Sequence, residues 1–179
     1  MPLPTHIIND GDLVTAGDSA IEVHYFGPNH GDGNIALSFD TDYGRLLAFV
    51  DTIEIGIAPY RSLPDTNFNG YLRSLEAAEA LHPSLVLGGH SGPGPGIWLT
   101  RFLNYFNDMK TSLAKANKEI DRLPAAPGED FIAAGERYIG RVIDRTVELM
   151  RPKYGQWRGF EEWAPMNAQT IRMAINVGR

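Results

Sequence analysis

The sequence contains no cysteine, which excludes disulfide bonds and thiolate metal ligands and leaves the redox compartment undecided. It also lacks any apolar run of about 18 residues, so no transmembrane helix is expected. The start of the chain, Met1-Pro2-Leu3-Pro4, has neither a basic cluster nor an apolar stretch, so no signal peptide is expected. We therefore expect a soluble protein, with the cytoplasm and the periplasm left open.

Positive charge is scarce as well, because 16 Lys and Arg residues face 22 Asp and Glu residues, for a formal charge of −6. A general nucleic-acid binder would need a basic face, so neither a nucleic acid nor a membrane is expected as a partner. The 179 residues are enough for one domain with a proper core. We expect a single domain over 1–179, with a sheet-containing part at 1–96 and a helical region at 97–179.

The first part of the chain is typical of β-structure, because short apolar runs alternate with turns rich in Gly, Asn and Asp. The nearly continuous apolar run 45–50, which is apolar after Arg45, predicts a central strand that is covered on both faces. The run 88–96 contains too much glycine and proline to predict a regular element. The remaining expected strands lie at 5–8, 12–15, 20–26, 34–39 and 84–87.

Helical periodicity dominates the second part of the chain. A first helix is expected from 67, with Asp65, Thr66 or Asn67 as its N-cap, and ends at His82-Pro83. In the third helix, Phe131 and Ile132 are assigned to the buried side and Pro152 to the end. The expected later helices span 97–122, 129–150 and 167–177. The predicted fold class is α/β, more closely α+β: a mixed sheet flanked by helices, with a helical C-terminal region.

Three polar residues, His30, Asp51 and His90, each follow or adjoin a predicted buried strand. Rigid strand ends can fix the geometry of ligands from distant parts of the chain. Two imidazoles and a carboxylate suit zinc or a similar metal. Simpler roles remain open, since His30 can be an ordinary loop histidine and Asp51 can cap a turn. The other histidines are assigned to strand surfaces (His6 and His24) and to a helix end (His82).

The segments around these residues resemble the metal-binding loops of metallo-β-lactamase-fold hydrolases. Residues 27–34 resemble the G-P-x-H-T-x-G-D loop, residues 47–51 the strand that ends in the metal-bridging Asp, and residues 85–93 the strand and P-G-H-G loop. The order and the approximate spacings agree. The resemblance implies that His30 and His90 each hold one metal, and that Asp51 bridges the metals and orients the catalytic water.

The departures from the family pattern are equally specific. The H-x-H-x-D-H motif of the N-terminal half is absent, so the chain keeps three of the seven ligands, and Gly31 and Asn34 stand where Thr and Asp are usual. The chain therefore resembles the C-terminal half of the αββα sandwich. We therefore expect an isolated piece, a natural truncation or one part of a split protein.

The resemblance implies a metal-dependent hydrolase in which metal-activated water attacks a small ester, lactone, lactam or thioester. Its cofactor would be zinc or another divalent metal, with one or two ions in a complete site. The interpretation leans toward an enzyme if a missing N-terminal half completes it. The alternative is a non-catalytic, truncated domain without metal that oligomerises or binds a partner. Because half a sandwich leaves one sheet face uncovered, a homodimer or pairing with the missing half is expected.

Overall fold

The computed structural model describes residues 3–61 and 67–177. The chain divides into two compact units, the first within Met1–Ile55 and Asp65–Leu103, and the second within Gly56–Pro64 and Asn104–Arg179. The strands are β1 (Leu13–Ala16), β2 (Ser19–His24), β3 (Ala36–Thr41), β4 (Gly44–Ala48), β5 (Leu85–Leu87) and β6 (Pro93–Pro95). The helices are α1 (Phe68–Ala80), α2 (Ile97–Glu119), α3 (Phe131–Tyr154) and α4 (Phe160–Val177).

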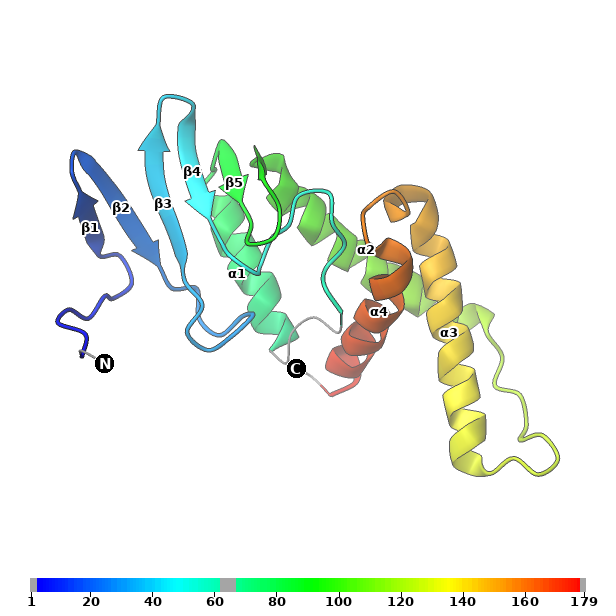
Figure 1. Ribbon diagram of the computed structural model, residues 1–179. Helices are drawn as coiled ribbons and strands as arrows, with labels where there is room; N and C mark the ends of the chain where they lie inside the picture. Colours follow the sequence, from blue (N-terminus) through cyan, green and yellow to red (C-terminus); the bar gives the residue numbers. More distant parts are fainter. Residues whose placement is uncertain (1–2, 62–66, 178–179) are drawn as a thin grey trace. The chain divides into compact units, whose positions relative to one another are not determined.

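The strands form one sheet in the order β1-β2-β3-β4-β5-β6, so each strand pairs with its neighbours in sequence (Figure 1). All pairs are antiparallel except β4 with β5, which is parallel. A parallel pair needs a crossover connection, and α1 lies within that connection. The mixed sheet with helices confirms the predicted fold class.

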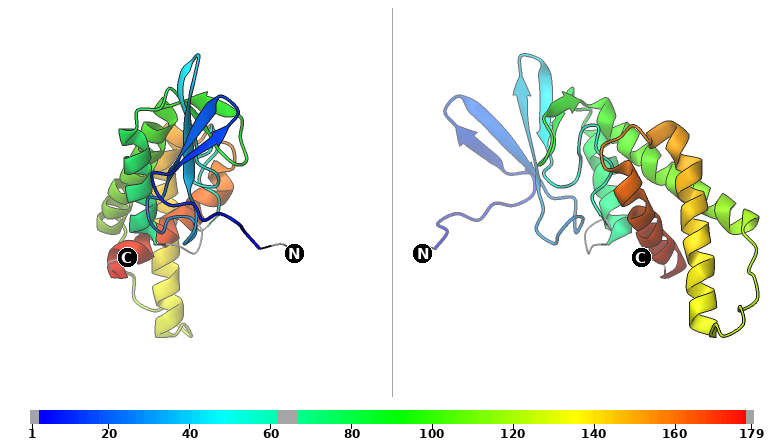
Figure 2. Two further views of the ribbon diagram at one scale, coloured as in Figure 1. Left: turned by 90° about the vertical axis from the view of Figure 1, so that its left-hand side faces the viewer. Right: turned by 45° about the vertical axis from the view of Figure 1, so that its right-hand side comes forward.

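The two faces of the sheet differ in how completely they are buried. The central row on one face consists of buried side chains, while Glu22, Asp40 and Arg45 lie toward the margin of that face and are not buried. Helix α1 lies along the sheet on one side (Figures 1 and 2). The other row is apolar but mostly half-buried, so the prediction that the strand around 45–50 is covered on both faces is wrong within the described residues. The buried row contains His24, Ala36, Ser38, Leu47, Phe49 and Val86. The half-buried row contains Ile21, Leu37, Phe39, Leu46, Ala48, Leu85 and Leu87, together with Val23, which is its buried member.

Three predictions about the strands and their surfaces are wrong. Residues 5–8 form no strand. His24 is buried rather than on a surface, and its Nε2 lies 2.8 Å from Ser38 Oγ on the neighbouring strand. The expected irregular run 88–96 contains β6, which pairs with β5. Its two prolines fit because β6 is an edge strand, where a proline need not donate to a ladder.

The helix predictions are mostly confirmed in position but not at their ends. Asn67 is the N-cap of α1, since its side chain accepts a hydrogen bond from Gly70 N, whereas Asp65 and Thr66 lie outside the described residues. Pro152 does not end α3, which continues to Tyr154. A proline removes one hydrogen bond there, and the buried side chains Met150 and Tyr154 hold the last turns in place.

Two further boundaries differ from prediction. Phe131 and Ile132 are 88% and 70% exposed, so the first turn of α3 has no buried side there. The last helix begins at Phe160, and Pro165 lies inside it. The buried residues Phe160 and Ala164 start its apolar face well before the predicted beginning at 167.

The second unit has a polar link through its core. Asn167 on α4 is fully buried, and its Oδ1 accepts a hydrogen bond of 2.7 Å from the Tyr105 hydroxyl. Its Nδ2 donates to the carbonyl oxygen of Pro59 at 3.1 Å. Helices α3 and α4 lie side by side in this unit (Figures 1 and 2). Over the described parts of the chain, none of the helices combines the length and the apolar character needed to span a bilayer.

Replacement of the buried ring of Phe49, the residue directly after β4, tests the core. Phe49 is fully buried, so Phe49→Ala should lower the free energy of unfolding by about 3–5 kcal/mol, measured by chemical denaturation. The neighbouring Val50 is 50% exposed and provides the control, for which Val50→Ala should change stability by less than about 0.5 kcal/mol. Equal losses in the two variants would contradict the burial pattern.

Candidate metal centre

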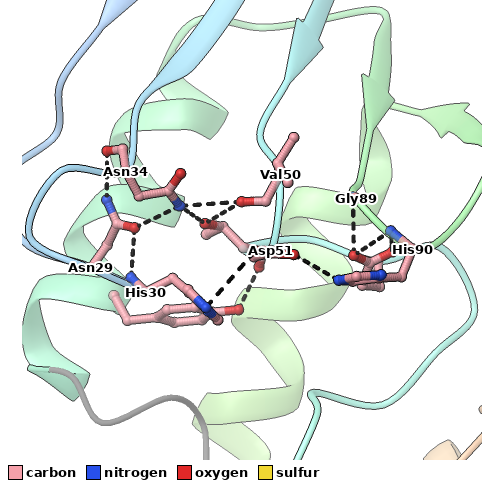
Figure 3. Close-up of polar contacts among 10 residues, drawn as sticks. Asn29, His30, Asn34, Val50, Asp51, Gly89 and His90 are labelled. Carbon is pink, nitrogen blue, oxygen red and sulfur yellow. Dashed lines mark hydrogen bonds and ion pairs between the residues drawn. The ribbon is translucent and has the colours of Figure 1, made fainter. Parts of the chain in front are cut away.

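Asp51 lies at the centre of the site, just beyond the end of β4. Its backbone is in the left-handed region, with φ of 60°, which aspartate tolerates better than most residues. The following residue is fixed by a buried hydrogen bond, because the Tyr71 hydroxyl donates to the carbonyl oxygen of Thr52. This local geometry places the Asp51 carboxylate between His30 and His90 (Figure 3).

Each carboxylate oxygen of Asp51 faces a different imidazole. Asp51 Oδ1 lies 2.7 Å from His90 Nε2, and Asp51 Oδ2 lies 3.9 Å from His30 Nε2. The structure thus brings together all three residues that the sequence singled out, from three separate loops of the first unit.

Two buried atoms at this site have no hydrogen-bond partner. They are Asp51 Oδ1 and His30 Nδ1, and they are the only such side-chain atoms among the described residues. Asp51 Oδ1 remains without one although His90 Nε2 is 2.7 Å away, so that close pair lacks hydrogen-bond geometry. Buried polar atoms are nearly always paired, and an unpaired carboxylate oxygen beside an imidazole nitrogen fits a divalent cation.

Glu54 is a fourth polar residue of the site, and the sequence analysis missed it. Its carboxylate oxygens accept hydrogen bonds from Gly89 N at 3.1 Å and from His90 N at 3.0 and 3.2 Å. Asp51, Glu54 and His90 each offer one ligand atom, and these atoms lie within 4.8 Å of one another. His30 stands outside this group. The available signal was a carboxylate three residues after Asp51, in the stretch between the expected strand at 45–50 and the expected helix from 67.

A pair of asparagines connects the His30 loop to the Asp51 loop. Asn29 is fully buried, and its Oδ1 accepts from His30 N at 2.6 Å and from Asn34 Nδ2 at 3.0 Å. Asn34 Nδ2 also contacts the carbonyl oxygen of Val50 at 3.1 Å and Thr52 Oγ1 at 3.0 Å (Figure 3). The side-chain amide of Asn34 therefore connects the His30 loop to the Asp51 loop, at the position where the family pattern has Asp.

Two glycines allow the His90 loop to approach the Asp51 loop closely. A Cβ atom on Gly88 would collide with the carbonyl oxygen of Ile53, and one on Gly89 would lie 3.0 Å from Asp51 Oδ1. The same loop contains Gly92, where a Cβ would meet nothing within 4 Å. The close contacts of Glu54 and Asp51 with this loop therefore depend on glycine at 88 and 89.

Tyr71 is buried near the carboxylates of Glu54 and Asp51, and its hydroxyl stays protonated. Burial, with the nearby negative charges of Glu54 and Asp51, raises the pKa of the Tyr71 hydroxyl well above its ordinary value. It therefore acts as a hydrogen-bond donor that supports the Asp51 loop rather than as a base.

Comparison with solved structures shows which known folds the chain resembles. An archaeal metallo-β-lactamase superfamily protein from Sulfolobus tokodaii matches 93% of this chain with 16% identity and a TM-score of 0.49. A metallo-β-lactamase family protein from Thermus thermophilus matches 99% of this chain with 15% identity and a TM-score of 0.55. The sequence matches no protein-family model and no curated protein.

The likeness to the Thermus protein shows that this chain has the metallo-β-lactamase fold, as the resemblance of the loops predicted. The match covers 51% of each solved chain, so the chain spans about half the length of these structures. At these identities the likeness concerns the fold alone.

A methyl group added to the His90 loop tests the close approach. Gly88→Ala should destabilise the protein by about 1–3 kcal/mol, because its Cβ cannot coexist with the Ile53 carbonyl oxygen unless the backbone shifts. Thermal and chemical unfolding would measure this loss. Gly92→Ala, in the same loop and in open space, is the matched control and should leave stability nearly unchanged. A Gly88→Ala protein as stable as the control would show that the loops do not approach as described.

Proposed function

We propose that this chain carries a divalent metal centre of a metal-dependent hydrolase, with zinc as the first candidate. The observation that supports the proposal is the Asp51 carboxylate, which lies between two imidazoles with a buried oxygen that no hydrogen bond satisfies. Two nitrogen ligands and a carboxylate form a donor set that zinc accepts. The metallo-β-lactamase fold agrees with such a centre.

The proposed substrates are small esters, lactones, lactams or thioesters. A bound metal would act as a Lewis acid and would activate a water molecule for attack on the carbonyl carbon. Asp51 has the role of a positioning carboxylate, since each of its oxygens faces a different imidazole. His30 and His90 hold opposite sides of the site. The chain spans about half of the structures it resembles, so turnover is proposed for an assembly in which further residues complete the site.

Metal analysis of the purified chain tests this proposal. The wild-type chain should bind about one zinc ion, and His90→Ala should weaken binding by at least about tenfold, as measured by equilibrium dialysis. His30→Ala should cause a smaller loss, because His30 lies farther from Asp51 than His90 does. His6→Ala is the control, since His6 is exposed and its position in the sequence is well separated from His30, Asp51 and His90.

Hydrolysis of a chromogenic ester or lactam by the metal-loaded protein is the second measurement. A wild-type chain that binds no divalent metal would refute the metal centre. A chain that binds metal without turnover would restrict the proposal to a metal-binding half that needs completion.

The half-buried row of the sheet favours a second role, assembly with another copy of the chain. Its members are apolar and none is charged, including Leu37, Leu46 and Leu85. In a two-fold symmetric dimer this surface would meet itself, so an apolar row without charges is self-compatible. We propose a homodimer through this face, which would imitate a two-layered sheet sandwich.

Sedimentation equilibrium tests the dimer. The wild-type chain should sediment as a dimer, and Leu37→Glu should shift it toward monomer, because a charge in the apolar contact would be buried without a partner. Tyr43→Glu, at a position that is 83% exposed in the β3–β4 turn, is the control. A well-folded wild-type monomer at high concentration would contradict the assembly.

A further inference from the structure

We propose that Glu54 is the third protein ligand of the metal centre, so that this chain alone offers the set Asp51, Glu54 and His90. The inference rests on the proposed function, because it presumes that a divalent metal binds here. Neither the family-like loops nor the three residues singled out in the sequence include Glu54. Its assignment comes from the positions of its carboxylate atoms.

The three ligand atoms are close enough for one ion. Atoms of Asp51, Glu54 and His90 lie within 4.8 Å of one another. In a tetrahedral zinc site with bonds of about 2.0–2.2 Å, ligand atoms lie about 3.4 Å apart. Three protein ligands with a fourth position left for water are the usual number in a catalytic zinc site. His30, which faces the other carboxylate oxygen, Asp51 Oδ2, would then lie outside this set of ligands.

The charge at the site provides an independent reason for a cation. Asp51 and Glu54 are carboxylates with ligand atoms within 4.8 Å, and like charges at this distance repel. In the parts of the chain that the structure describes, neither forms a salt bridge with a lysine or an arginine. A divalent cation would neutralise both carboxylates and would satisfy the buried oxygen of Asp51.

The carboxylate of Glu54 has capacity left for a metal after its hydrogen bonds. Oε1 accepts from both Gly89 N and His90 N, at 3.1 and 3.0 Å, whereas Oε2 has only the longer contact of 3.2 Å with His90 N. A carboxylate offers about four lone-pair positions, so Oε2 can bind a cation while Oε1 retains the loop. One side chain thus positions the backbone of His90 and binds beside its ring.

These two tasks of Glu54 can be separated by substitution. In Glu54→Gln, the amide oxygen can keep the hydrogen bonds from Gly89 N and His90 N, but the NH₂ group that replaces the second oxygen cannot bind a cation. In Glu54→Ala, both tasks are lost. Glu136→Gln, at an exposed position on α3, is the matched control for the loss of one negative charge.

The experiment measures two properties of each metal-free protein. Zinc affinity, from calorimetric titration with Zn²⁺ and a repeat with Mn²⁺, should fall at least about tenfold in Glu54→Gln and Glu54→Ala, and remain unchanged in Glu136→Gln. Amide hydrogen exchange at Gly89 and His90, measured without metal, should speed up in Glu54→Ala and stay near the wild-type rate in Glu54→Gln.

The outcomes distinguish this inference from the proposal beneath it. If the wild type binds neither ion, the metal centre and the role of Glu54 both fail. If the wild type binds zinc and Glu54→Gln binds it equally well, the metal centre stands and Glu54 is only a holder of the loop, which overturns the inference. Reduced affinity in Glu54→Gln with wild-type exchange at Gly89 and His90 supports the ligand role.

Discussion

The position of the Asp51 carboxylate is the constraint on which the site depends. Asp51 follows the fully buried side chains of Leu47 and Phe49. The backbone hydrogen bond from Phe49 N to Leu87 O at 3.0 Å extends the parallel pairing with β5 one residue beyond the end of β4. Polar residues that follow adjacent parallel strands emerge at the same edge of a sheet. Asp51 and His90 therefore meet because the backbone pairs, and His30 joins them through the asparagine link with Asn34.

Much of the fold could be predicted from the sequence, because hydrophobic periodicity reports which side of an element is buried. The helix after Asn67 follows this rule. In β2 the rule failed, because His24 and its neighbour Val23 are both buried. Periodicity could not find β6, since Pro93-Gly94-Pro95 has neither an apolar pattern nor strand propensity, and only its pairing with β5 defines it. Nor could local rules place the end of α3, where burial of Tyr154 outweighs the break expected at Pro152.

The candidate site likewise contains residues that the sequence could reveal and one that it could not. His30, Asp51 and His90 were found because each adjoins a recognisable strand and matches a family loop. Glu54 has no such signal, because its role depends on the backbone N–H groups of a loop 35 residues away in sequence. Contacts of this kind exist only after the chain has folded. They are therefore absent from any pattern of residue types, although the glycines at 88 and 89 indicate that something must approach closely there.

The parallel pairing of β4 with β5 also makes the two ends of the sheet unequal. The strand beginnings, at Gly44 and Leu85, lie at the opposite edge from Asp51 and His90. The turn between β3 and β4, where Tyr43 is 83% exposed, lies at that distant end, so extra residues there would lengthen a loop without displacing either functional side chain. The sheet thus has one end whose loops fix the geometry of the site, and another at which the exposed β3–β4 turn can accept added residues at little cost.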